Sequence, residues 1–173
     1  MTTTLNATTS NGLVATPDNS GAIALQNNGV TGFNLTAAGY PLTPLRPAFY
    51  ATKTNGNTGT SGTIVYNNVL LNIGSGYSAS TGIFTAPVSG TYQFNITAIS
   101  ATGGYVETAV YYNGTSSMVF NIRGSGSTGT TAGAGGGFCY FMNATDTMRC
   151  GVAGSASQFG DGPYTTFSGY LIG

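Results

Sequence analysis

Short runs of β-branched and aromatic residues recur along the whole chain, separated by clusters of glycine, serine, threonine and asparagine. Glycine alone occurs 28 times in 173 residues. No stretch longer than about ten residues places apolar side chains at the i, i+3, i+4, i+7 spacing of an amphipathic helix. Short runs bounded by frequent turn signals are typical of a β-sandwich or a barrel. The sequence therefore predicts an all-β fold.

The run Gly90–Ile99 is the clearest strand, because Tyr92, Phe94, Ile96 and Ala98 alternate with polar residues, as in a half-buried antiparallel strand. The full set of predicted strands is Ala22–Gln26, Ala48–Thr52, Thr63–Tyr66, Val69–Ile73, Gly82–Thr85, Gly90–Ile99, Val106–Tyr112, Met118–Ile122, Gly137–Met142, Thr147–Val152 and Thr165–Ile172. Their number and roughly ten-residue spacing favour a jelly-roll sandwich.

A proline-rich segment, Tyr40–Pro47, divides the chain. Proline fixes its own φ and favours an extended predecessor, so this segment is expected to be a stiff connector. We expect an N-terminal arm over residues 1–46 and one domain over residues 47–173. The glycine-rich stretches Thr52–Gly62 and Gly124–Gly137 are expected to be surface loops.

Charge is scarce, since only 5% of the residues are charged. The chain has no histidine, which excludes a Ser-His-Asp triad, a Cys-His dyad and HExxH zinc chemistry. Four basic residues give no basic stripe for nucleic acid, and no apolar run approaches the ~20 residues of a membrane span. The first residues lack a basic and an apolar region, so we expect no secretory signal and synthesis in a bacterial-type cytoplasm.

The few carboxylates show no pairing that acid–base catalysis would need. Glu107 is expected on a solvated strand face, and Asp146 is expected to bond the backbone of a turn. The run Gly133–Gly137 has no helix or Lys-Ser/Thr after it, so it is no phosphate-binding loop. The sequence predicts neither an enzyme nor a cofactor.

The two cysteines, Cys139 and Cys150, lie symmetrically about Ala144 and Thr145. If Asn143–Asp146 is a hairpin turn, the cysteines are cross-strand neighbours close enough for a disulfide. The alternative is a pair of buried thiols, which synthesis in a reducing cytoplasm favours.

Four segments from Pro47 onward resemble, in order, the globular domain of the complement C1q/tumour-necrosis-factor superfamily. They are PAFYA at 47–51, the block at 63–98, Thr145–Met148, and TFSGYLI at 166–172. Within the block, the residues that match the family pattern are Tyr66, Asn67, Val69, Asn72, Gly74, Tyr77, Gly82, Phe84, Ala86, Pro87, Gly90, Tyr92 and Phe94.

The resemblance implies a ten-stranded jelly roll that assembles as a compact homotrimer. It places Phe167 nearest the three-fold axis. Phe138 and Tyr140 are weaker candidates for the same place. The alternative is that all three residues belong to the core of one chain. Calcium-binding relatives use acidic loops, whereas the acids here are dispersed, so no metal is expected, although three symmetry copies of one aspartate stay open as an alternative.

The segment at 11–39 resembles one that is common in bacteriophage virion proteins, especially tail-fibre-like ones. Its residues predict a hairpin ribbon with a turn at Asn28-Gly29. It has too few apolar residues for its own core, so it packs on its own trimer, a neighbouring trimer or a larger particle. The expected anchoring side chains are Leu13, Val14, Ile23, Leu25, Phe33 and Leu35.

These resemblances together imply a bacteriophage virion protein. The favoured expectation is a trimeric capsid decoration or cement protein that bridges subunits of the major capsid protein. A tail-fibre tip that binds host-surface glycan through tyrosine-rich loops is the alternative. A free lectin-like module is less favoured, because it would leave the arm without a purpose.

Overall fold

The computed structural model describes residues 21–57, 61–100, 104–114, 116–126, 132–153, 158, 160 and 162–173. The chain divides into two compact units, Met1–Leu45 and Arg46–Gly173.

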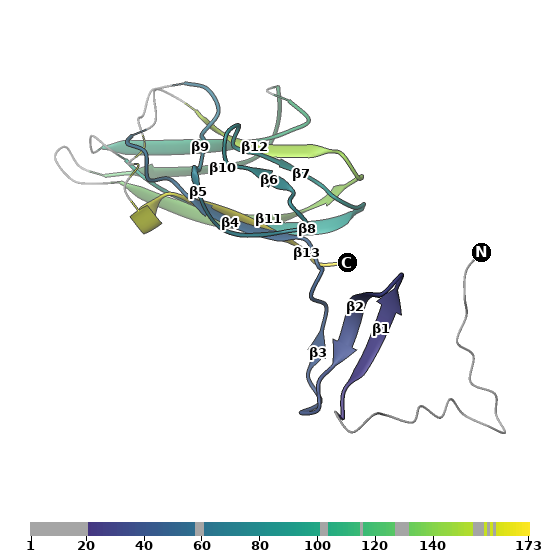
Figure 1. Cartoon of the computed structure of the whole chain (residues 1–173). Helices are drawn as coiled ribbons and strands as arrows, with labels where there is room; N and C mark the ends of the chain where they lie inside the picture. Colours follow the sequence, from purple (N-terminus) through teal and green to yellow (C-terminus); the bar gives the residue numbers. More distant parts are fainter. Residues whose placement is uncertain are drawn as a thin grey trace. The chain divides into compact units, whose positions relative to one another are not determined.

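The unit Arg46–Gly173 is a sandwich of two antiparallel sheets of five strands each (Figure 1). The first, which we call the β8 sheet, has the order β11-β8-β13-β4-β5. Its strands are β4 (Ala48–Thr52), β5 (Asn68–Ile73), β8 (Gly90–Ile99), β11 (Gly133–Met142) and β13 (Thr166–Leu171). The short helix η1 (Gly162–Tyr164) precedes β13.

The second sheet, which we call the β9 sheet, has the order β10-β9-β12-β7-β6. Its strands are β6 (Tyr77–Ser78), β7 (Ile83–Thr85), β9 (Tyr105–Tyr112), β10 (Ser117–Ser125) and β12 (Thr147–Val152). Non-consecutive strands are neighbours in both sheets, so the chain repeatedly crosses from one layer to the other. The predicted all-β sandwich is confirmed.

The alternation predicted for β8 is confirmed, because Tyr92, Phe94, Ile96 and Ala98 are all buried between the sheets. The facing sheet contributes Phe84, Val106, Val110, Met148 and Cys150 to the same core. Each strand thus presents one apolar face inward, which is why so polar a chain still encloses a continuous core.

The centre of this core is a set of closely packed aromatic rings. The Phe49 ring stacks on Tyr77 and on Phe84 at 4.9 and 4.8 Å between centroids, and meets Phe167 edge-on at 4.9 Å. Gly169 makes room for this packing: a Cβ there would lie 2.7 Å from the Phe94 ring and 2.8 Å from the Phe49 ring. No larger residue fits at that position without moving the rings.

Two sequence-based expectations about strands are wrong. Thr63–Tyr66 forms no strand, but only a bridge between Thr63 and Gly151, although Ile64 and Tyr66 are buried. The expected loop Gly124–Gly137 has strand at both described ends, since β10 extends to Ser125 and β11 begins at Gly133 and pairs with β8 throughout. Pairing with a well-formed neighbour overrides the low strand propensity of glycine.

The expected hairpin around Asn143–Asp146 is also wrong, because β11 lies in the β8 sheet and β12 in the β9 sheet. Cys139 pairs in register with Gln93, and Cys150 with Val110. Both cysteines are free, the first exposed and the second buried. The symmetric spacing indicated a hairpin only if the two strands bonded each other, but their connection passes between layers. The structure contradicts the possible disulfide. The alternative of two buried thiols is correct for Cys150 but not for Cys139, whose thiol is free but exposed.

The unit Met1–Leu45 contains a second, smaller sheet, which we call the arm sheet, with the order β1-β2-β3. Its strands are β1 (Ile23–Asn27), β2 (Val30–Leu35) and β3 (Pro41–Leu42). Asn28 and Gly29 connect β1 to β2 with φ of 49° and 78°. Positive φ at both central residues is the type I′ geometry that favours Asn-Gly, so the predicted turn is confirmed.

We expect Phe167→Ala to lower the free energy of unfolding by about 3–5 kcal/mol, because Phe167 is fully buried and its loss leaves a cavity among rings. Met118→Ala, at a side chain on β10 that is 56% exposed, is the control and is expected to change it by less than about 0.5 kcal/mol. Denaturant unfolding measures both. Equal effects in the two variants would contradict the placement of Phe167.

We expect both cysteines to be alkylated when the protein is unfolded without a reducing agent. The Cys150 thiol is buried and its pKa is raised to about 12 by desolvation, so alkylation of this thiol requires unfolding. Mass spectrometry should find two adducts per chain, the same number as after prior reduction. Fewer adducts in the unreduced sample would mean that a disulfide exists.

Candidate interaction surfaces

The carboxylate of Glu107 lies on the outer face of the β9 sheet, within a surface network. It accepts hydrogen bonds from the Asn121 amide at 2.8 Å and from the Tyr105 hydroxyl. The Arg123 guanidinium stacks over the Tyr105 ring at 4.8 Å from its centroid. Glu107 is thus on the outer face as expected, but it is partly buried by its neighbours rather than fully solvated.

Asp146 has the turn role that the sequence predicts. Its carboxylate accepts the Asn143 backbone N–H at 2.7 Å, the Asn113 amide at 2.8 Å and the Tyr112 hydroxyl at 2.6 Å. The hydrogen bonds from Asn113 and Tyr112 hold the pKa of this carboxyl below its usual value. The hydrogen bond to Asp146 in turn raises the pKa of Tyr112. Asp146 therefore fixes the connection between the two sheets.

Two of the basic side chains serve the fold. Arg149 is mostly buried, donates to the Gly114 carbonyl and the Thr63 hydroxyl at 2.9 and 2.8 Å, and lies over the Tyr111 ring. Lys53 donates to Asn55 at 2.6 Å, and burial lowers its pKa. Neither cation is left for steering a charged partner.

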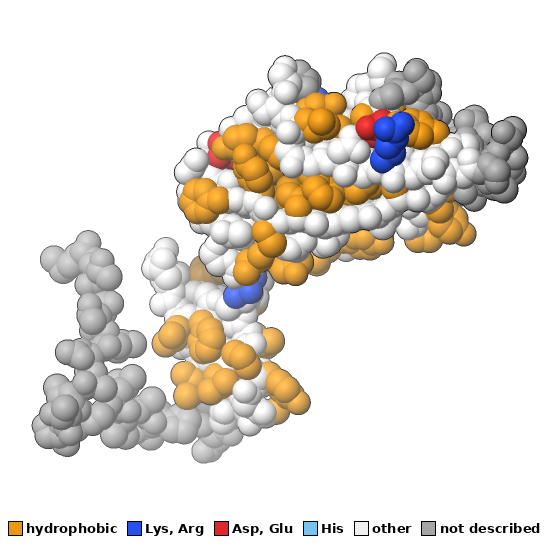
Figure 2. Space-filling view, turned by 180° about the vertical axis from the view of Figure 1, so that it is seen from behind, with side chains coloured by type: hydrophobic (Ala, Val, Ile, Leu, Met, Phe, Trp, Pro, Cys, Tyr) orange, Lys and Arg blue, Asp and Glu red, His pale blue; other side chains and the backbone are white. Residues whose placement is uncertain are grey.

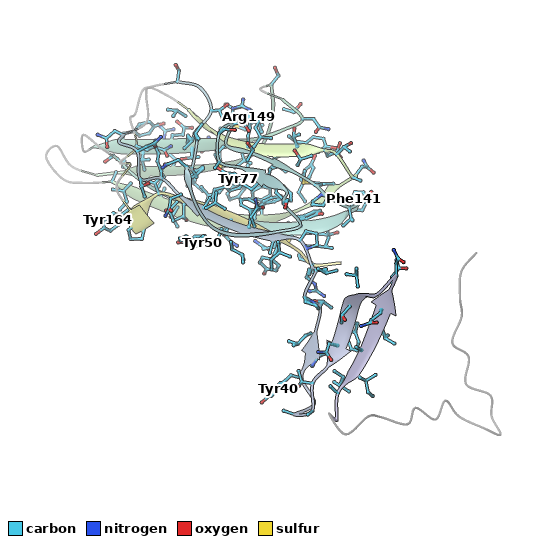
Figure 3. The ribbon with its side chains drawn as sticks, viewed as in Figure 1. Tyr40, Tyr50, Tyr77, Phe141, Arg149 and Tyr164 are labelled. Atoms are coloured by element: carbon cyan, nitrogen blue, oxygen red, sulfur yellow. The ribbon has the colours of Figure 1, made fainter. Side chains whose placement is uncertain are left out.

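The outer face of the β8 sheet is the broad surface of the sandwich without charge. No residue of its five strands is charged, and the structure describes all of them. Tyr50 lies on the side of this sheet and Arg149 on the opposite side of the sandwich, with Tyr77 between the layers (Figure 3). Register places the following residues on this outer face: Ala48, Tyr50, Leu71, Thr91, Gln93, Asn95, Thr97, Cys139, Phe141, Ser168 and Tyr170.

Of the three residues expected at a trimer interface, only Phe167 is contradicted by the structure of the single chain. Phe167 is fully buried within one chain, so it has no surface to offer a second chain, and its expected place at the axis is corrected. Phe138 and Tyr140 lie on the inner face of β11, where Phe138 stacks on Phe94 at 5.4 Å and Tyr140 meets Tyr112 at 5.0 Å. These contacts fit the alternative of packing within one chain, but both rings are only partly buried, so their place at a trimer interface stays a prediction.

Sequence reasoning missed the outward residues Tyr50, Leu71, Phe141 and Tyr170. The signal was available in TFSGYL, because a strand that buries Phe167 and Gly169 must direct Ser168 and Tyr170 outward. Tyr170 is 45% exposed. An uncharged outer face with scattered large side chains is suited to contact with another uncharged surface.

The arm sheet offers a second uncharged surface. Ile23 pairs with Leu35 and Leu25 with Phe33, so these four side chains share one face. Gln26 and Thr31 form a hydrogen-bonded pair of the other face. Figure 2 shows hydrophobic side chains gathered over this sheet. The predicted anchors Leu13 and Val14 lie outside the described residues.

Within the described ranges, no three His, Cys, Asp or Glu side chains gather in a way that would hold a metal ion. No helix in that part of the chain is both long and apolar enough to cross a membrane. The surfaces that the described residues offer for contact are the outer face of the β8 sheet and the apolar face of the arm sheet.

Three solved structures show the same fold at low sequence identity. The globular domain of zebrafish complement 1qA is 22% identical, with 74% of this chain and 98% of that chain covered and a TM-score of 0.61. Murine APRIL is 12% identical, with 73% of this chain and 99% of the APRIL chain covered and a TM-score of 0.61. Eiger TNF from S. frugiperda is 9% identical, with 74% of this chain and 94% of the Eiger chain covered and a TM-score of 0.57.

These likenesses confirm the C1q/TNF-like jelly-roll fold that the four sequence segments predicted. Domains of this kind are generally non-enzymatic, in agreement with a site made of contact surfaces. They typically form homotrimers. The sequence itself matches the C1q domain family over residues 48–172. The chain therefore belongs to the C1q domain family.

Proposed function

We propose that this protein is a bacteriophage virion structural protein, a homotrimeric decoration protein that attaches to the major capsid protein and stabilises the capsid. The observation that carries the proposal is the pair of uncharged contact surfaces, one on the β8 sheet and one on the arm sheet. The likeness of the arm sequence to phage virion segments supplies the context, and the virion is the proposed location.

The proposed trimer uses the outer face of the β8 sheet. Association is unopposed by charge there, and contact would remove Tyr50, Leu71, Phe141 and Tyr170 from water. The charged side chains among the described residues of the sandwich lie outside this sheet, which fits a surface that contacts other copies of the same chain. Calcium from three symmetry-related aspartates is not part of the proposal; of the aspartates, Asp146 already accepts hydrogen bonds within its turn.

The proposed attachment uses the arm. Its anchors, Leu13 and Val14 with the apolar face of the arm sheet, gain free energy only when they are covered. Burying half of a ~150 Å² apolar side chain contributes roughly 2 kcal/mol at ~25 cal/mol per Å². Three arms on one trimer raise each other's effective concentration, so weak docking by each gives strong attachment.

A receptor-binding tail-fibre tip that recognises host-surface glycan is the second candidate. The likeness of residues 11–39 to tail-fibre segments favours it. A free lectin-like module would not use the arm.

We expect a homotrimer in solution, of about three times 17.4 kDa, in the presence of a metal chelator. Tyr170→Glu should raise the concentration needed for assembly by about 100-fold or more, since it buries an unpaired charge. Met118→Glu, on the β9 sheet, is the matched control and should leave the trimer intact. Light scattering over a concentration series measures both. A stable monomer, or equal effects of the two variants, would contradict the proposed interface.

We expect a chain that begins at Pro47 to form trimers but to leave capsids undecorated. Full-length protein should bind capsids that lack the native protein, and its binding should change little with salt, because the contacts are apolar. Sedimentation of capsids with each chain measures binding. If the shortened trimer binds capsids as well as the full chain does, the sandwich is the anchor. If the full chain does not bind capsids but binds host glycan, the fibre alternative replaces decoration.

A further inference from the structure

The apolar face of the arm sheet needs a cover. Ile23 is 45% exposed, Leu25 is 50% exposed and Phe33 is 36% exposed, although all three lie on one face of a sheet and Leu25 and Phe33 are cross-strand partners. A small three-stranded sheet is stable only when such a face packs on something. Within the unit Met1–Leu45, the described residues supply no second layer.

We propose that this face packs against the same face of the other two copies, so that the three arm sheets of one trimer form a single three-fold prism. The inference rests on the homotrimer of the proposed function. It adds that the arms attach to the virion as one assembled unit, rather than as three separate ribbons. The side chains at the axis of the prism are Ile23, Leu25, Phe33 and Leu35.

The charge of the arm favours other copies of the chain over a charged partner. Residues 21–45 contain no Asp, Glu, Lys or Arg. Identical surfaces with a net charge repel each other, whereas these copies have nothing to repel them. The same lack of charge gives a basic or acidic partner nothing to pair with.

The amphipathic register selects the face that meets the axis. Leu25 and Phe33 oppose each other on it, while the neighbouring pair, Gln26 and Thr31, is hydrogen-bonded on the reverse side at 3.2 Å. Closing three amphipathic sheets around an axis buries the first pair and leaves the second outside. In this arrangement Ile23, Leu25, Phe33 and Leu35 are covered by the other copies rather than by the capsid, so the attachment of the proposed function is left to Leu13, Val14 and the reverse face of the prism.

The apolar face of one arm sheet is too small to hold three arms together unless the trimeric sandwich also joins them. Ile23, Leu25 and Phe33, which are 36–50% exposed, together with the partly exposed Leu35 offer roughly 300 Å² of apolar surface per arm. Three such faces together remain below the ~1,200 Å² of a small stable interface. Arms that are free in solution would therefore not associate, but arms joined to one trimer meet at an effective concentration in the millimolar range.

Cysteine cross-linking of the full-length trimer, in the absence of capsids, tests the prism. The background variant is Cys139→Ser, which removes the exposed native thiol. Leu25→Cys and Ile23→Cys place a thiol on the apolar face, and Gln26→Cys and Ala24→Cys place one on the reverse face as matched controls. Under mild diamide oxidation, the first two should form inter-chain disulfides at least ~10-fold faster than the controls.

Two outcomes would overturn the inference. In the first, the variants are trimeric but cross-link no faster than their controls. In the second, the thiols at 23 and 25 resist a soluble maleimide without cross-linking, which would mean that residues 1–20 of the same chain cover the face. Both outcomes leave the proposed trimer standing. A monomeric sandwich would instead refute the proposed function itself, so the two failures are distinguishable.

Discussion

The contact of aromatic rings over Gly169 is the interaction on which the rest of the sandwich depends. Phe49 and Phe167 come from adjacent strands of the β8 sheet, and Phe84 comes from the β9 sheet, so their rings join the two layers. Gly169 lets the rings approach the backbone of β13. Because this contact fixes which side of β13 faces inward, it also fixes which residues the β8 sheet presents outward.

The distribution of charge follows from that division into faces. The described sandwich keeps Glu107, Arg123 and Arg149 on the β9 sheet, where aromatic rings and amides hold them. The β8 sheet has none. In a chain with so few charges, this leaves one broad surface that self-association does not penalise. The proposed trimer is the simplest use of such a surface.

The arm differs from the sandwich, because the described residues of the unit Met1–Leu45 supply no second layer to cover its sheet. Its Asn28-Gly29 turn sets the register, and the register gathers Ile23, Leu25 and Phe33 on one side. A head that trimerises would hold three such faces close together, which links the proposed assembly of the sandwich to the proposed state of the arm. Attachment to a virion would then depend on both units.

The sequence by itself determined the all-β class, the family, the Asn28-Gly29 turn, the role of Asp146 and the inward side of β8. Each is set by local chemistry: alternation, turn geometry or motif spacing. Only the tertiary structure decided that Phe167 is core, that β11 extends through its glycines, and that Cys139 and Cys150 lie in different sheets. These depend on which strands pair and on which layer each occupies, and strand pairing is a long-range choice that short sequence windows do not contain.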